Sequence, residues 1–378
     1  MSGRRPACRS PVAVLVATLV VTGLLAGACG CGRESGHGVV SSQPAGTQAI
    51  GPLTALTVAD HRIPALASLL APGDRVIVRQ RISFTVGDHT VTALQHGRPV
   101  DVLVTCSDEY PPDLARDGLL QPLDTQRLPG LNAIAPAMRA LPGSTLDGRL
   151  YAVPLEAEVI GIVYDPRAWT RPPVSFRAFF SRSATGRVAM IDSPVLSLQI
   201  GALALGYREP AALNDAQLLR VTVLYEKRRD NFSVFWRRRS GLLRAFRSGE
   251  VTLAAATEND ALWLGEHGIP VRFTPGAEGG LLWACLAGIP ASAPRPGVAY
   301  AFLRSALSPA GGAAKADRYL AASFNGDSRN APGALPPEVA LRTTTDAQCA
   351  VTAVRPADVA AWLIAWTKAK QPGRPGCG

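Results

Sequence analysis

Residues 151–164, YAVPLEAEVIGIVY, form an apolar run with two glutamates that a strand would place on one side. Residues 101–105, DVLVT, read as a second buried strand. Upstream, the patterns predict a strand over 54–58, a helix over 64–70, a strand over 75–79 and a helix over 91–96. Such alternation predicts βαβ units, a mostly parallel sheet and an α/β fold. Because ligands bind at the carboxyl ends of strands in open sheets, residues 105–110 are a favoured place for a site.

The later elements continue this α/β pattern. Residues 111–150 predict a helix followed by a long surface connection. The remaining predictions are helical segments over 176–181, 196–205, 299–307 and 357–368, and strands over 188–191 and 281–290, the last preceded by a turn over 276–280. The densest arginine run, residues 227–247 (KRRDNFSVFWRRRSGLLRAFR), has two interpretations. It is either a solvated helix face or a docking surface for another protein.

The N-terminus predicts export and a lipid anchor. Three arginines precede an apolar run over 12–25 that is too short to span a bilayer, so residues 1–28 are predicted to be a signal peptide. The small residues before Cys29 resemble a lipobox, which implies that Cys29 is lipidated at the extracytoplasmic membrane face. The alternative is an ordinary signal peptide with an incidental Cys29. Residues 29–52 are small and polar and predict a flexible tether.

Composition excludes several classes of function. With 47% hydrophobic and 18% charged residues, the chain is ordinary for a soluble globular protein, and its length predicts two lobes. The net charge is +10, but export removes nucleic acid as a natural partner. No CxxC, GxSxG or HExxH motif occurs, so we expect no zinc finger, no enzyme activity and no cofactor.

Several segments in collinear order resemble one family. They are DVLVT (101–105), YPPDLARDGLLQPLD (110–124), YAVP and GIVYD (151–165), RVAMIDSP (187–194), ALALGY (202–207), SGEVTLA (248–254), HGIPVRF and EGGLLWACLAGIP (267–290), AYAFLRSALSP (299–309) and LPPEV (335–339). The chain thus resembles the spermidine/putrescine-binding proteins, the extracytoplasmic receptors of polyamine ABC transporters. The resemblance implies a two-lobed, type II periplasmic-binding-protein fold with a ligand cleft between lobes joined by crossing strands. Lobe 1 is expected to comprise 53–155 and 283–330, and lobe 2 to comprise 156–282 and 331–370.

The resemblance also implies pocket positions, some of which lack the family's residue types. A polyamine requires carboxylates for its ammonium groups and aromatic side chains for its methylenes. Trp283 matches a pocket aromatic, whereas Ser193 and Cys285 stand where the family has acids. The further implied positions are His61, Ser107, Tyr110, Thr257, Phe324 and Gln348. Acids that would compensate are Asp108, Glu109, Glu156, Glu158, Glu258 and Asp260.

Some of these residues have a structural alternative. Glu156 and Glu158 are either ligand carboxylates or solvated residues at the cleft mouth. His61 is either a contact or a loop histidine, and Trp283 is either a cleft wall or core. Alignment places three cysteines near the cleft, so we expect a disulfide between two of Cys106, Cys285 and Cys349, or between Cys349 and Cys377. A metal site is not expected.

The sequence therefore predicts a monomeric, lipid-anchored receptor that captures a small polar, cationic solute and delivers it to an ABC permease and its ATPase. Closure of the lobes would bury the solute. Two alternatives remain. One is a lipoprotein sensor or scaffold that no longer binds polyamines. The other is a receptor for a neutral or anionic solute, for which Arg62, Arg98 and Arg208 are candidates.

Overall fold

The computed structural model describes part of the chain, all of it within the unit formed by residues 51–378. The described residues are 53–57, 76–80, 99–106, 114–134, 139, 141–169, 171–316 and 350–371. The predicted signal peptide, the tether and Cys29 lie outside them, as do the predicted helices over 64–70 and 91–96. No helix within these ranges combines the length and apolar character needed to cross a membrane.

A mixed sheet runs through the described residues in the order β2-β1-β3-β11-β6-β9-β7-β8. Its strands are β1 (Leu53–Thr57), β2 (Val76–Gln80), β3 (Val102–Cys106), β6 (Ala152–Tyr164), β7 (Val188–Ile191), β8 (Phe232–Trp236), β9 (Leu253–Thr257) and β11 (Leu281–Gly288). The pairs β1–β2, β1–β3, β7–β8 and β7–β9 are parallel, as the βαβ pattern predicts. The two long strands β6 and β11 are antiparallel to each other, and β6 is antiparallel to β9 and β11 to β3. Strand β11 also pairs in parallel with the short strand β12 (Val351–Thr352).

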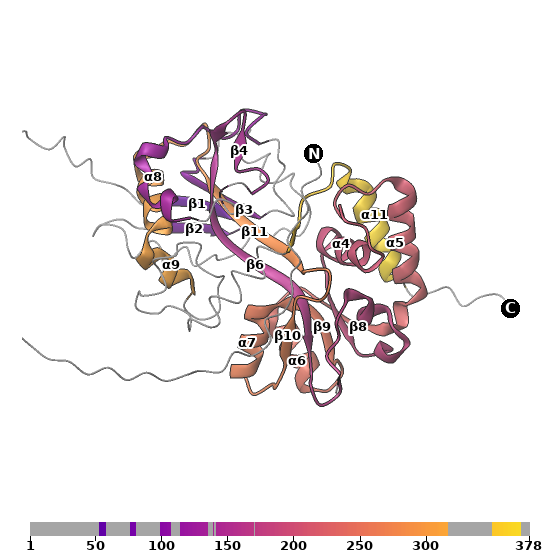
Figure 1. Ribbon diagram of the computed structural model, residues 1–378. Helices are drawn as coiled ribbons and strands as arrows, with labels where there is room; N and C mark the ends of the chain where they lie inside the picture. The colour runs from indigo at the N-terminus through magenta and orange to yellow at the C-terminus, as the bar shows by residue number, and fades with distance from the viewer. Residues whose placement is uncertain are drawn as a thin grey trace, which may run out of the picture. The chain divides into compact units, whose positions relative to one another are not determined.

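Strand β6 lies in the middle of this sheet, between β11 and β9 (Figure 1). Its residues 152–160 pair with β11, and residues 160–164 pair with β9. Its end also pairs with β10 (Arg272–Thr274), where Phe273 and Thr274 lie so close to Gly161 that a Cβ atom would clash at 2.5 to 2.8 Å. All thirteen residues of β6 are buried, including both glutamates. We call β6 and β11 the crossing strands, because this pair connects the strands β2, β1 and β3 to the strands β9, β7 and β8.

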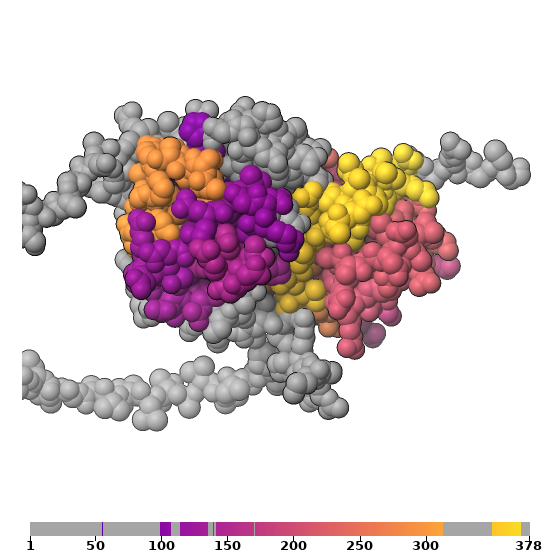
Figure 2. All heavy atoms as spheres, turned by 90° about the horizontal axis from the view of Figure 1, so that it is seen from above, coloured from indigo at the N-terminus to yellow at the C-terminus, as the bar shows by residue number. Residues whose placement is uncertain are grey.

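Three helices cover the C-terminal part of the sheet. They are α4 (Pro194–Ala204), α5 (Asp215–Lys227) and α11 (Val359–Lys370). Figure 2 shows α11 in yellow against the pink atoms of the chain around α5, in agreement with their mutual contacts. Helix α4 is buried along its whole length, because it packs between the sheet and the other two helices.

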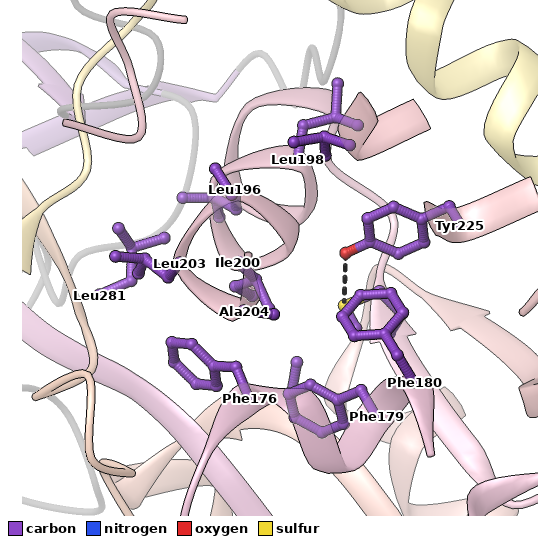
Figure 3. Packing of buried hydrophobic residues seen from close by; sticks show 14 of the residues in the cluster. Phe176, Phe179, Phe180, Leu196, Leu198, Ile200, Leu203, Ala204, Tyr225 and Leu281 are labelled. Atoms are coloured by element: carbon purple, nitrogen blue, oxygen red, sulfur yellow. Dashed lines mark hydrogen bonds between the residues drawn. The ribbon is translucent and has the colours of Figure 1, made fainter. Parts of the chain in front are cut away.

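The largest hydrophobic core formed by the described residues lies beneath these helices (Figure 3). Phe176, Phe179 and Phe180 pack against α4, and the Phe180 ring meets Tyr225 edge to face at 4.9 Å. The Tyr225 hydroxyl donates to the Ser197 carbonyl over 2.5 Å, and burial raises the pKa of Tyr225 well above its usual value. This bond satisfies the one polar atom of a side chain that is otherwise surrounded by apolar groups.

Further α-helices occur in the described residues. They are α6 (Arg239–Arg247), α7 (Glu258–Glu266), α8 (Pro296–Leu307) and α9 (Pro309–Ala316). Arg295, the N-cap residue of α8, donates to the fully buried Asp101 at 2.6 Å. The aspartate that opens the DVLVT run therefore joins β3 to α8.

Two local predictions were wrong. Within residues 111–150, where one helix followed by a surface connection was predicted, residues 114–134 contain turns and two short 3-10 helices, η1 (Thr125–Arg127) and η2 (Pro129–Ala133). The arginine run is also not one helix. It contains η5 (Arg229–Asn231), β8 and α6, because the apolar FSVFW segment pairs with β7 and separates the charged segments. Residues 176–181 are helical, but as the 3-10 helix η3 (Phe176–Phe180).

Candidate functional site

The crossing strands bring two buried glutamates opposite two residues of β11. Glu156 is paired in register with Cys285, and Glu158 with Trp283. Directly opposite side chains lie on the same face of an antiparallel sheet, so these four side chains share a face. Glu156 is 3% exposed and Glu158 is 6% exposed. Burial of this extent contradicts the interpretation of both glutamates as solvated residues.

Trp283 combines features of both interpretations offered by the sequence. It is partly buried and packs against the core cluster beneath α4, α5 and α11. Its register partner is a glutamate, so an indole ring lies beside a carboxylate on the same face. An aromatic ring next to a carboxylate is a combination that suits an alkylammonium ion.

A disulfide joins Cys106 at the end of β3 to Cys285 on β11. The two cysteines are paired in register, and both are fully buried. The prediction of a disulfide among Cys106, Cys285 and Cys349 is therefore confirmed, with Cys106 and Cys285 as the bonded pair. Cys285 consequently meets the site as a disulfide sulfur and not as a free thiol. The bond ties the crossing strand β11 to the last residue of β3.

Helix α7 adds a second group of polar residues to this face. β9 ends at Thr257, which pairs with Ile160 on β6 and serves as the N-cap of α7. Thr257 and Asp260 form a capping box, in which each side chain accepts from the other's backbone N–H. The first turn contains Glu258, Asn259 and Asp260, which are all buried. A helix N-terminus stabilises such carboxylates through its dipole.

Hydrogen bonds connect α7 to Glu158 and α6 to α7. Asn259 Nδ2 donates to Glu158 Oε1 over 3.0 Å. Arg239 Nε donates to Asp260 Oδ1 over 2.6 Å, and the Arg239 side chain is 29% exposed. Glu156, Glu158, Asp260 and the Arg239 guanidinium interact electrostatically and thus belong to one cluster, which we call the acidic cluster.

The electrostatics of this cluster are set mainly by burial. Burial raises the pKa of Glu158 above its usual value, and the Asp260 and Glu156 carboxylates raise it further, against the lowering effects of Arg239 and Asn259. Burial lowers the pKa of Arg239, but Asp260 and Glu158 outweigh this effect and raise it overall. A second cation placed here would favour the ionised form of Glu158.

The other predicted site residues divide into two groups. Ser193 is buried and its Oγ caps α4 by accepting from the Leu196 N–H over 3.2 Å. The remaining predicted positions lie outside the described residues: His61, Ser107, Asp108, Glu109, Tyr110, Phe324 and Gln348. Within the described ranges, no three His, Cys, Asp or Glu side chains are grouped as metal ligands.

Sequence reasoning missed Arg239 and Asn259. Arg239 belongs to the arginine run, in which no local signal distinguishes it from its exposed neighbours. Asn259 is the second residue after the apolar LAAAT strand, near the position where parallel α/β units place ligand groups. That position was a usable signal for Asn259.

The crossing strands link two sets of parallel strands and carry part of the buried acidic cluster. A family model described as bacterial extracellular solute-binding protein matches residues 75–325, and the chain belongs to this family. It is thus a bacterial extracellular solute-binding protein. No curated protein matches the chain.

Solved structures show the same fold, that of type II periplasmic binding proteins. The spermidine/putrescine ABC transporter substrate-binding protein PotD of Streptococcus pneumoniae is 17% identical, with a TM-score of 0.70 over 85% of this chain and 100% of that one. The TpPotD lipoprotein of Treponema pallidum is 17% identical, with a TM-score of 0.70 over 84% and 99%. MotA of A. tumefaciens B6, in complex with glucopine, is 15% identical, with a TM-score of 0.64 over 85% and 100%. The resemblance to the spermidine/putrescine-binding proteins is confirmed at the level of family and fold.

Proposed function

We propose that this receptor captures a small cationic solute, of the polyamine class, and delivers it to an ABC permease. The observation that carries the proposal is the pair of buried glutamates on β6, with Trp283 opposite Glu158. Burying two carboxylates is costly unless positive charge compensates them. Glu156, Glu158 and Asp260 act on one Arg239 guanidinium, and an ammonium group is the ligand chemistry that complements such buried carboxylates.

Reduced screening strengthens this preference for a cation. An ion pair in a buried site is stabilised more than one at the surface, because the effective dielectric constant is lower. The Trp283 ring would contact the methylene groups and the cationic end of an alkylamine. The positions that lost the family's acids, Ser193 and Cys285, are compensated in this proposal by Glu156, Glu158 and Glu258.

The proposed role is binding and delivery without catalysis or a cofactor, by a monomer held at the extracytoplasmic face of the membrane. The anchor would be a lipid on Cys29, and the partners would be the permease and its ATPase. The lipoprotein among the structural relatives supports this anchor. Metabolic labelling with a radioactive fatty acid tests it: the native protein would be labelled, and Cys29→Ser would not.

The experiment for solute class is calorimetric titration of the purified protein with putrescine, spermidine, a neutral sugar and an anionic phosphonate. We expect one-to-one binding of an amine at micromolar affinity or tighter, a free energy of about 8 kcal/mol or more, and no heat from the other two. If only the sugar or only the phosphonate binds, the solute is neutral or anionic and the proposal of a cationic solute is wrong. No heat from any amine would favour a sensor or scaffold with this fold.

A further inference from the structure

A hollow separate from the acidic cluster lies on the described surface, between β8 and α6. It is a groove of about 780 Å³, a volume in the range of small-molecule sites. Val234, Phe235 and Trp236 contribute apolar surface from β8. Residues of α6 and of the turn after it form the other wall. No residue of the acidic cluster lines this groove, although Arg239 of that cluster also belongs to α6.

Four exposed arginines line this groove: Arg237, Arg238, Arg244 and Arg247. Arg244 and Arg247 are three residues apart on α6, so they project from neighbouring positions on the helix surface. Among the described residues, no carboxylate is paired with Arg238 or Arg244, while Arg247 donates to the His267 carbonyl. The groove therefore offers guanidinium groups that are available for an incoming anion.

The acids that line the groove do not cancel this charge. Asp192 and Glu250 are the two acidic lining residues. The Asp192 carboxylate already accepts from Lys370 at 2.6 Å, from Trp366 at 2.9 Å and from Arg237 at 2.8 Å. Asp192 is thus neutralised within the fold, which leaves an excess of positive charge around the groove.

The beginning of α6 favours the same sign of ligand. Its N-cap is Arg238, which makes no side-chain capping bond, and its first turn contains no acidic residue. Ser240 and Gly241 of that first turn line the groove. The N–H groups at an uncapped helix N-terminus favour an anion through their hydrogen-bonding capacity and the helix dipole.

We propose that this groove binds a phosphate-bearing anion with two or more negative charges and an adjoining apolar part. Guanidinium groups bind phosphate oxygens in pairs, which a single ammonium does not do. The apolar residues of β8 would contact the non-phosphate part of the ligand. The phosphate can come from a soluble phosphate ester or from the headgroup of an anionic lipid, and both present the same chemistry to the arginines.

The test is calorimetric titration with pyrophosphate in about 0.15 M salt, where weak surface attraction is screened. We expect saturable binding to the native protein and a loss of at least about tenfold in affinity for Arg238→Gln/Arg244→Gln. Arg220→Gln removes an exposed charge on α5 outside the groove and should bind as the native protein does. The single variant Arg244→Gln, at an exposed position, serves if the double variant fails to fold by circular dichroism.

A second arm distinguishes the two sources of phosphate. The protein is sedimented with vesicles of phosphatidylcholine, with and without phosphatidylglycerol. Binding to the phosphatidylglycerol vesicles alone, lost in the double variant, assigns the groove to a lipid headgroup. Pyrophosphate binding without vesicle binding assigns it to a soluble ester. Absence of both in the native protein, or an equal loss in Arg220→Gln, overturns the proposal.

Discussion

Asn259 donates a hydrogen bond to Glu158 over 3.0 Å, although 101 residues separate them in the chain. The bond joins the first turn of α7 to the crossing strand β6. It holds the Glu158 carboxyl in one orientation while leaving its second oxygen outside this bond. The acidic cluster is therefore oriented by the fold before any solute arrives, and such preorganisation reduces the cost of binding.

Removing the Asn259 amide should weaken both the fold and the solute site. In Asn259→Ala the buried Glu158 oxygen loses a donor, so the free energy of unfolding should fall by about 1–3 kcal/mol. Urea denaturation measures this change. Asn132→Ala, at an exposed position on η2, is the control and should stay within about 0.5 kcal/mol of the native protein. Equal stability of both variants would show that the bond does not contribute.

Glu158 should make stability depend on pH in an unusual direction for a carboxyl group. Because the folded-state pKa is raised, the folded protein holds this proton more tightly than the unfolded chain does. The stabilisation is complete below the ordinary glutamate pKa of about 4.3 and is lost as the pH rises through the raised value. Compared with Glu158→Gln, the native protein should lose stability over this window. The test is to measure the urea midpoints of both proteins at several pH values. If the two midpoints change with pH in parallel, the prediction is contradicted.

Solute binding should release a proton from the same group. A cationic ligand favours ionised Glu158, so in the pH range where the free protein is protonated, binding should tighten as the pH rises. Calorimetry in buffers of different ionisation enthalpy counts the released protons. A putrescine-binding enthalpy that is the same in all buffers would exclude this linkage.

Arg239 should contribute to the free energy of unfolding through its ion pair with Asp260. Replacement in Arg239→Gln leaves two buried acids, Asp260 and Glu158, without their cation, and should cost about 1.5–3 kcal/mol of unfolding free energy. Arg220→Gln on α5 removes an exposed charge and should cost little. Similar losses for both variants would mean that general charge, and not this pair, is responsible.

The Cys106–Cys285 bond should stabilise the fold by lowering the conformational entropy of the unfolded chain, since it closes a loop with a sequence separation of 179 residues. The double variant Cys106→Ala/Cys285→Ala should lose about 2–5 kcal/mol. Intact mass after alkylation under denaturing conditions, with and without reduction, tests whether the bond forms. Modification of both cysteines without reduction would contradict it.

The sequence predicted those elements whose signals are local. Strand β6 was visible because its apolar run is long, and α4 because its apolar segment follows Pro194. The 3-10 form of η3 and the strand β8 inside the arginine run depend on tertiary packing, which outweighs local propensity. The glutamates of the site were found by alternation. Arg239 was not, because its partner Asp260 is distant along the chain and only the fold joins them.

The most direct test of the cation site is the dissociation constant of putrescine for the native protein and for Glu156→Gln/Glu158→Gln. Glu209→Gln, an exposed acid outside the cluster, is the matched control. We predict micromolar or tighter binding to the native protein and the control, and a loss of at least about a hundredfold in the double variant. Unchanged putrescine binding by a folded double variant would contradict the account.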